Sequence, residues 1–356
     1  MNRTLLLGMA AVAAISATAV MAVPAGYPIQ VVPVGKGPFN FPPGFGIDFP
    51  KVKIMVTEKL APNLVILHGN AGVDAGHPDG SGGRVAVLYG PDGVLMVDTE
   101  NKQVAEKTLA AVRTLSKGPI KFVISSHAHG DHTGANAFFA KQGAIMIGQE
   151  NLRYEMMPAP NASAQQKANY EPGGLPFMTY QYDPAKPGTP ALTIKMNGEI
   201  VDAIPMMPSH LGGDTVVRFR NANVIYIEDF FRNFGFPFAD QGNGGSIKGM
   251  LDAIDLFSKL SDDNTILIPG HGTLIHKKDL LPYRKMLVDV MAKVKDMKGQ
   301  GKSLKDVLAS NVLKPYEGGT DGDTQSSKDR FLTEVYAEVN DLPPIVNGRR
   351  TMPKMD

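Results

Sequence analysis

The sequence predicts an α/β fold in which two β-sheets face each other and helices cover their outer surfaces. Two observations indicate this arrangement. The chain contains two strand-rich halves, and each half ends in segments with helical spacing. In both halves, side chains that could bind a metal stand where predicted strands end. The sequence shows no internal repeat at a fixed short period.

In the first half, short apolar runs bounded by turn residues predict strands. The turn Gly90-Pro91-Asp92-Gly93 lies between two such runs and is typical of a β-hairpin. Apolar residues recur at helical spacing from Val104 to Leu115. We predict strands at 64–67, 84–89, 94–98, 121–126 and 144–147, and helices at 101–115 and 133–141.

The second half shows the same kinds of pattern. Ser246 is a candidate N-cap for a helix over 246–260, and residues 278–298 have the spacing of a long amphipathic helix. Ser303 and Ser326 are expected to open two shorter helices. We predict strands at 192–196, 200–206, 215–219, 224–227 and 266–268.

A long segment, residues 151–190, separates the two halves and shows no regular pattern. A connection of this length without secondary structure is usually functional or disordered. It is rich in methionine and aromatic residues, which favour packing over another surface. We therefore expect a lid or a wall of a substrate site.

The N-terminus has the features of a signal peptide over residues 1–22. Arg3 precedes an apolar run, and Val20-Met21-Ala22 offers a cleavage site. The run is short for a membrane span, so an uncleaved anchor is the alternative. We expect export to a bacterial periplasm or secretion, without stable membrane insertion after processing.

Residues 23–57 form a Pro/Gly-rich extension that would pack its aromatic side chains onto the main domain or onto a second copy of the chain. Residues 58–290 would form the catalytic domain, and 291–356 a C-terminal helical extension.

Composition excludes several classes of function. The net charge of +1 over 356 residues gives no reason to expect nucleic acid or an acidic polymer as a partner. We expect a small-molecule substrate. Cysteine is absent, which excludes disulfides and thiolate ligands. Any metal must therefore be held by nitrogen and oxygen atoms.

The strongest candidate site is His127-Ala128-His129-Gly130-Asp131-His132, between a predicted strand and a predicted helix. Residues two apart in extended backbone point the same way and lie about 7 Å apart, so His127 and His129 can converge on one ion. Asp131 and His132 could hold a second ion. A polar loop that happens to contain histidines is the alternative. His210, Asp229 and His271 each follow a predicted strand, although each is a weak signal alone.

Together, these residues resemble the metallo-β-lactamase superfamily, whose four-layer αββα sandwich holds one or two metals between its sheets. The resemblance covers roughly Glu58 to Met286 and includes five motifs. It implies that Asp98 supports the ligands without binding metal itself. By this resemblance, His127, His129 and His210 bind the first metal, Asp131, His132 and His271 bind the second, and Asp229 bridges the two.

The resemblance implies a dinuclear zinc hydrolase, with iron or manganese as other candidate metals. Zinc lowers the pKa of a bound water to about 7, which makes a nucleophile available to attack a lactam, lactone or thioester carbonyl. Asp131 would orient that nucleophile. The specialised β-lactamases of the superfamily usually carry Cys or Ser where this chain has Asp229, whereas Asp resembles the glyoxalase II-like and lactonase-like branches. An iron-dependent oxidoreductase resembling persulfide dioxygenases and a non-catalytic periplasmic metal-binding protein are the alternatives.

Three further expectations concern residues near the motifs. Asn243 lies in a glycine-rich segment and could bind a substrate carboxylate or oxyanion; a glycine loop with a helix cap is the alternative. Glu228 stands where the family commonly has glycine, and strand alternation favours a side chain on the face away from the site. His68, His77 and His276 lie outside the motifs and receive no role.

Overall fold

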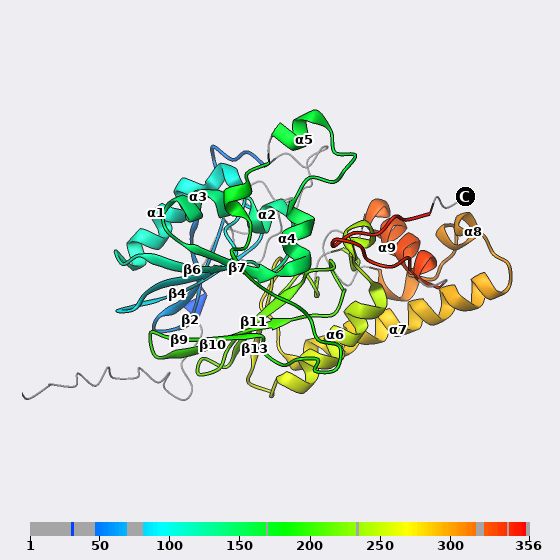
Figure 1. The fold of residues 1–356 in the computed structure, drawn as a ribbon. Helices are drawn as coiled ribbons and strands as arrows, with labels where there is room; N and C mark the ends of the chain where they lie inside the picture. Colours follow the sequence, from blue (N-terminus) through cyan, green and yellow to red (C-terminus); the bar gives the residue numbers. More distant parts are fainter. Residues whose placement is uncertain are drawn as a thin grey trace, which may run out of the picture.

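The computed structural model in Figure 1 describes residues 30–31, 47–69, 81–168, 170–232, 235–317, 324–339 and 342–353. The predicted signal peptide, most of the 23–57 extension and His77 lie outside the described residues. Within the described ranges, no helix combines the length and the apolar character that a membrane span requires.

The first sheet contains eight strands whose spatial order follows the chain. The pairs from β1 to β5 are antiparallel, and those from β5 to β8 are parallel. Parallel neighbours need crossover connections. These are η1 (Lys102–Val104) and α1 (Ala105–Leu115) between β5 and β6, α2 (Gly130–Thr133) and α3 (Asn136–Lys141) between β6 and β7, and the longer segment 150–177 between β7 and β8. The strands are β1 (Gln30–Val31), β2 (Met55–Ala61), β3 (Leu64–His68), β4 (Val85–Gly90), β5 (Gly93–Val97), β6 (Ile120–Ile124), β7 (Ile145–Gln149) and β8 (Met178–Tyr180).

The second sheet has five strands in the order β13-β12-β11-β10-β9. Helix α6 (Ile247–Leu260) connects the parallel pair β12 and β13, and α7 (Lys277–Gly299) follows β13. The strands are β9 (Leu192–Met196), β10 (Glu199–Pro205), β11 (Thr215–Phe219), β12 (Val224–Glu228) and β13 (Ile266–Pro269).

The two sheets pack face to face, and helices cover both outer surfaces (Figure 1). Alternate residues of one strand point to opposite faces, so Ile66 packs between the sheets while Val65 packs under the α1 side. Phe219 and Tyr226 of the second sheet meet the inner face of the first. Because both faces of the strands are buried, these strands appear in the sequence as continuous apolar runs. The predicted αββα sandwich is confirmed.

The C-terminal helices pack against the outer layer of the second sheet. Helix α8 (Leu304–Leu308) and η4 (Lys314–Tyr316) lead to α9 (Gln325–Glu338), whose Phe331 and Val335 join the cluster formed with α6 and α7. The predicted C-terminal helical extension is therefore present.

The prediction of an irregular segment over 151–190 is wrong. This segment contains most of α4 (Glu150–Met156), α5 (Ala164–Ala168), η2 (Pro172–Gly174) and β8. Strand β8 is too short to show a period of its own. It forms by pairing with the edge of β7, where Ile147 lies opposite Met178.

Helix starts were predicted with mixed success. The Ser246 hydroxyl accepts the Gly249 N–H, and the Ser303 hydroxyl accepts the Asp306 N–H, so both predicted caps are confirmed. Helix α9 begins after Thr324, not at Ser326. The helix expected over 133–141 is divided into α2 and α3.

Candidate metal centre

The candidate ligands come from four loops at one edge of the sandwich. These loops follow β6, β10, β12 and β13. The two sheets are joined beside the site, because the backbone N–H of Thr215 on β11 donates to the carbonyl of Ser126, the residue before His127. Three groups of side chains each place their ligand atoms within 4.8 Å of one another. These groups are His127, His129 and His210; His127, His132 and Asp229; and Asp131, His132 and His271.

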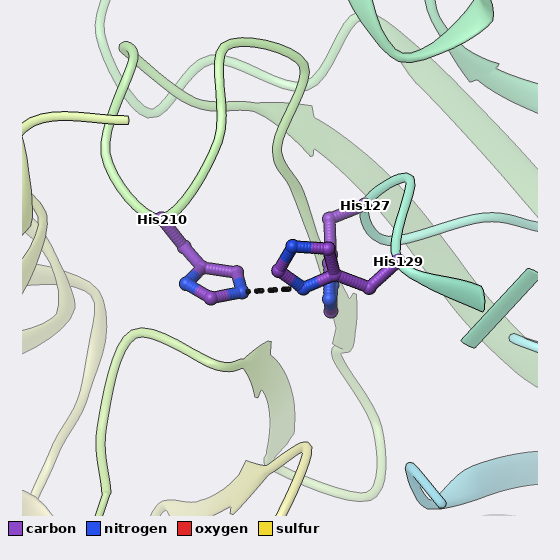
Figure 2. Close-up of side chains that lie close together, drawn as sticks. All are labelled: His127, His129 and His210. Atoms are coloured by element: carbon purple, nitrogen blue, oxygen red, sulfur yellow. Dashed lines mark hydrogen bonds between the residues drawn. The ribbon is translucent and has the colours of Figure 1, made fainter. Parts of the chain in front are cut away.

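Figure 2 shows the first group, in which the rings of His127, His129 and His210 converge. His210 Nε2 lies 3.1 Å from His129 Nδ1. The outer nitrogens have acceptors: His210 Nδ1 is 2.8 Å from the Phe238 carbonyl, and His129 Nε2 is 3.2 Å from Asp240 Oδ2. In neutral rings the outer nitrogens therefore carry the hydrogens. The two inner lone pairs then face each other, an arrangement that a cation between them would stabilise.

The group of Asp131, His132 and His271, hereafter the second group, has the same design. His271 Nε2 lies 3.1 Å from Asp131 Oδ2 and 3.4 Å from His132 Nε2. The outer nitrogen of His132, Nδ1, lies 2.8 Å from Asp98 Oδ2. Here too a carboxylate behind the ring directs the other nitrogen inward.

Asp229 lies between the two groups. Its Oδ2 is 3.7 Å from His210 Nε2 and 3.5 Å from His271 Nε2, and its Oδ1 is 3.5 Å from His132 Nε2. One carboxylate thus faces a nitrogen of the first group and two nitrogens of the second. This is the position that a bridging ligand would occupy.

The electrostatics of the cluster suit a metal. Burial, followed by the neighbouring histidines, lowers the pKa of His127, and burial lowers the pKa of His210 to about 3. Burial alone would raise the pKa of Asp229, but His271, His132 and His210 outweigh it and hold that pKa at about 2. Burial likewise opposes a charged His132, yet Asp131 and Asp229 raise its pKa to about 10. His127 and His210 are therefore neutral beside the ionised Asp229, as a divalent ion requires, whereas His132 has to give up its proton when a metal binds.

Two buried ligand atoms test whether a metal fits. His127 Nε2 and Asp229 Oδ1 have no hydrogen-bond partner among the residues that the structure describes. A buried polar atom without a partner is costly, and both atoms belong to the groups above. Buried nitrogen and oxygen atoms that converge in this way fit a divalent transition metal.

Asp98 lies behind the ligands, where the resemblance placed it. Its Oδ1 accepts the Ser126 N–H at 2.7 Å, and its Oδ2 accepts the hydroxyls of Ser126 at 2.6 Å and Tyr226 at 3.0 Å, besides the contact with His132. Four donors therefore hold this carboxylate in place.

Asn243 is oriented toward Asp240. Its side-chain Nδ2 donates to Asp240 Oδ2 at 2.8 Å, so Asn243 supports the carboxylate that contacts His129. A substrate contact through Asn243 stays a prediction. The sequence did not predict the contact between Asp240 and His129, because the two residues lie 111 positions apart and no local pattern connects them.

The expectation for Glu228 is wrong. Its side chain is buried on the site side, with Oε2 3.0 Å from His127 Nδ1. The backbone at Glu228 is left-handed, with φ of 43°, and the register of β12 against β13 shifts there, so strand alternation no longer applies. Burial, with the carboxylates of Asp214 and Asp229, raises the pKa of Glu228.

His68 and His276, to which the sequence assigned no role, contact the backbone carbonyls of Gly82 and Thr265 through their ring nitrogens.

One side of the cluster reaches solvent. The side chains of His129 and Asp131 are 26% and 27% exposed, whereas those of His127, His132 and His210 are fully buried. Phe238 stacks on His129, with ring centroids 5.8 Å apart. An open pocket of about 680 Å³ lies beside this stack, between the loop at 238–241 and α9, with Asp240, Gln241 and Arg330 among its lining residues.

Comparison with known proteins agrees with this geometry. The model of the family described as the metallo-beta-lactamase superfamily matches residues 79–271, more than half of the 356 residues. No curated protein matches the sequence. Among solved structures, a metallo-beta-lactamase from Pontibacter korlensis is similar at 17% identity and a TM-score of 0.53, over 67% of this chain and all of that one. The metallo-beta-lactamase IND-7 is similar at 16% identity and a TM-score of 0.51, over 65% of this chain and 98% of that one.

Proposed function

Because the chain belongs to the metallo-beta-lactamase superfamily, we propose that it is a dinuclear zinc hydrolase that cleaves a small lactam, lactone or thioester. The observation that carries this proposal is the position of Asp229, which faces both groups of ligands. The superfamily consists largely of hydrolases, and a bridged pair of ions about 3.5–4 Å apart can stabilise attacking and leaving atoms together.

In this proposal His127, His129 and His210 would hold one ion, Asp131, His132 and His271 would hold the other, and Asp229 would contact both. The bound ions would supply Lewis acidity and lower the pKa of a water to about 7. With Asp229 shared, each ion would have four protein ligands, and zinc can expand to a fifth, such as a water. The partial exposure of His129 and Asp131 supports an open position on that side.

Asp131 is the residue that we assign to orienting the attacking water. Its carboxylate lies at the exposed side of the cluster, and the neighbouring histidines outweigh burial and keep its pKa low. An ionised carboxylate there can accept a hydrogen bond from an attacking water and so orient it. The pocket beside Phe238 and Arg330 is the proposed location of the substrate's substituents.

The substrate class follows from chemistry and from location. Related structures carry the name β-lactamase, and one of them was exposed to ceftazidime. At 14–17% identity these relatives support the fold and not the substrate. Asp229 favours a lactone or thioester, whereas the proposed export to the periplasm favours a lactam or lactone over a cytoplasmic thioester. A lactone satisfies both arguments.

An iron-dependent oxidoreductase is the second candidate, and one observation favours it. The described ligand groups contain only imidazole and carboxylate donors, which suit iron as well as zinc. The natural metal therefore has to be measured.

The test begins with metal analysis of protein purified without added metal. The zinc-loaded mature protein is then assayed on a chromogenic cephalosporin, an acyl-homoserine lactone, an aryl ester and a glutathione thioester, and the iron-loaded protein is assayed for oxygen uptake with a persulfide. Two equivalents of zinc with turnover of one carbonyl substrate would support the proposal. Native iron with persulfide-dependent oxygen uptake, and no hydrolysis, would refute it in favour of the second candidate.

A further inference from the structure

Glu228 has three features that the proposed hydrolysis does not use. Its side chain is fully buried, its backbone is left-handed, and its Oε1 has no hydrogen-bond partner among the described residues. A left-handed conformation is unfavourable for any residue with a Cβ, and a buried carboxylate loses its hydration. Strain of this kind persists where the surrounding structure requires it, commonly at a functional site.

The contacts of Glu228 point to His127. Glu228 Oε2 lies 3.0 Å from His127 Nδ1 and also accepts the backbone N–H of Asp229 at 2.6 Å. The second neighbour of His127 Nδ1 is Ser126 Oγ, at 3.1 Å, and that hydroxyl gives its hydrogen to Asp98. Both neighbours of Nδ1 therefore act as acceptors, so Nδ1 carries the hydrogen of the neutral ring.

The consequence concerns the other nitrogen. With the hydrogen on Nδ1, His127 Nε2 presents a lone pair, and this atom is the one that is buried without a partner and belongs to the ligand group with His129 and His210. A carboxylate behind a ligating imidazole fixes its tautomer, orients the ring and strengthens the donor atom. Asp240 and the Phe238 carbonyl stand in the same relation to His129 and His210.

We propose that Glu228 is a positioning residue, which locks His127 in the Nδ1–H tautomer and directs Nε2 at the first metal. This inference rests on the proposed metal centre but not on the identity of the substrate. Glu228 thereby completes a set in which each histidine of the first group has its own acceptor.

The left-handed backbone at Glu228 allows mutations to distinguish a role in positioning His127 from a role in the stability of the fold alone. Glycine adopts this conformation without steric cost, so Glu228→Gly relieves strain and removes a buried carboxylate. Glu228→Gln keeps the shape of the side chain but leaves one acceptor oxygen in place of two. If Glu228 served only the fold, Glu228→Gly would lower stability and leave metal affinity unchanged. Under the proposal, metal affinity falls while the stability of the metal-free protein does not.

The matched control is Glu199→Gln. Glu199 is also a buried glutamate that accepts backbone N–H groups, from Ile200, Asn221 and Ala222. It begins β10, whereas His210 follows the other end of that strand. Its replacement is expected to cost stability without changing the affinity for metal.

The experiment titrates zinc into each full-length mature protein against a chromogenic chelator and fits two dissociation constants. We expect the first-site affinity to fall about tenfold in Glu228→Gln and up to about 100-fold in Glu228→Gly, with a smaller change at the second site and none in Glu199→Gln. Thermal melting of the metal-free proteins should place Glu228→Gly at or above the wild type. In the zinc-loaded wild type, ¹⁵N–¹H NMR should show His127 protonated at Nδ1.

The outcomes separate this inference from the proposed function. A wild type that binds no zinc would refute the metal centre itself. Zinc binding by the wild type with first-site constants within twofold in both Glu228 variants would overturn the role of Glu228 alone. If neither variant folds, the tautomer decides, because a hydrogen on His127 Nε2 in the zinc-loaded wild type contradicts the proposal.

Discussion

Replacing Glu334 with glutamine should remove a loss of stability that the wild type suffers as the pH rises toward 8. Glu334 lies on α9, is 7% exposed, and accepts the Ala239 N–H at 3.0 Å with its Oε2. Ala239 lies between Phe238 and Asp240, which contact the candidate ligand His129. The prediction therefore tests how the C-terminal extension holds the loop beside the metal centre.

Burial is the main reason why the pKa of Glu334 is raised from 4.5 to about 8. Below pH 4.5 the carboxyl is protonated in both the folded and the unfolded protein. Between pH 4.5 and about 8, Glu334 of the folded protein retains a proton that the unfolded chain has lost. Unfolding then releases a proton, so the free energy of unfolding falls as the pH rises. Each unit of difference between the folded and unfolded pKa changes the free energy of unfolding by about 1.4 kcal/mol. The rise from 4.5 to about 8 therefore lowers the free energy of unfolding by at most about 5 kcal/mol.

Urea unfolding of both proteins at a series of pH values measures this effect. Glutamine imitates the protonated acid, so the stability of the wild type relative to Glu334→Gln should fall with increasing pH, and titration of other groups cancels in the difference. The control is Glu317→Gln, because Lys328 and Lys314 lower the pKa of Glu317 and its titration has the opposite sign. A difference between wild type and Glu334→Gln that stays constant from pH 5 to pH 8 would refute the reasoning.

Three further predictions concern the metal centre and processing. Asp131→Asn at saturating zinc should lose about 10²-fold or more in kcat, because it removes the carboxylate that orients the attacking water; near-wild-type turnover would remove Asp131 from the mechanism. His132→Ala and His271→Ala should each weaken the second zinc site more than the first in chelator competition, and equal losses at both sites would contradict the assignment. Mass spectrometry of exported protein should find an N-terminus at or near Val23, and an intact Met1 would argue against cleavage.

The sequence by itself determined the layers of the fold and the candidate ligands. Strands such as β5 and β12 are buried on both faces, and burial on both faces leaves a continuous apolar run that can be read locally. The motif from His127 to His132 is equally local, since its spacing alone brings two imidazoles to one side of an extended chain. Ser246 and Ser303 cap helices through bonds that span three residues, so these starts were also predictable.

Only the tertiary structure decided which atoms face the metal centre. Glu228 turns toward His127 because its backbone is left-handed at the end of β12, a conformation that the sequence permits but does not require. Asp240 reaches His129 across 111 residues, and β8 forms because β7 offers it an unpaired edge. These contacts depend on how distant segments pack, and no local periodicity encodes such packing. The sequence therefore predicted the ligand residues, whereas the acceptors that orient their rings emerged only from the fold.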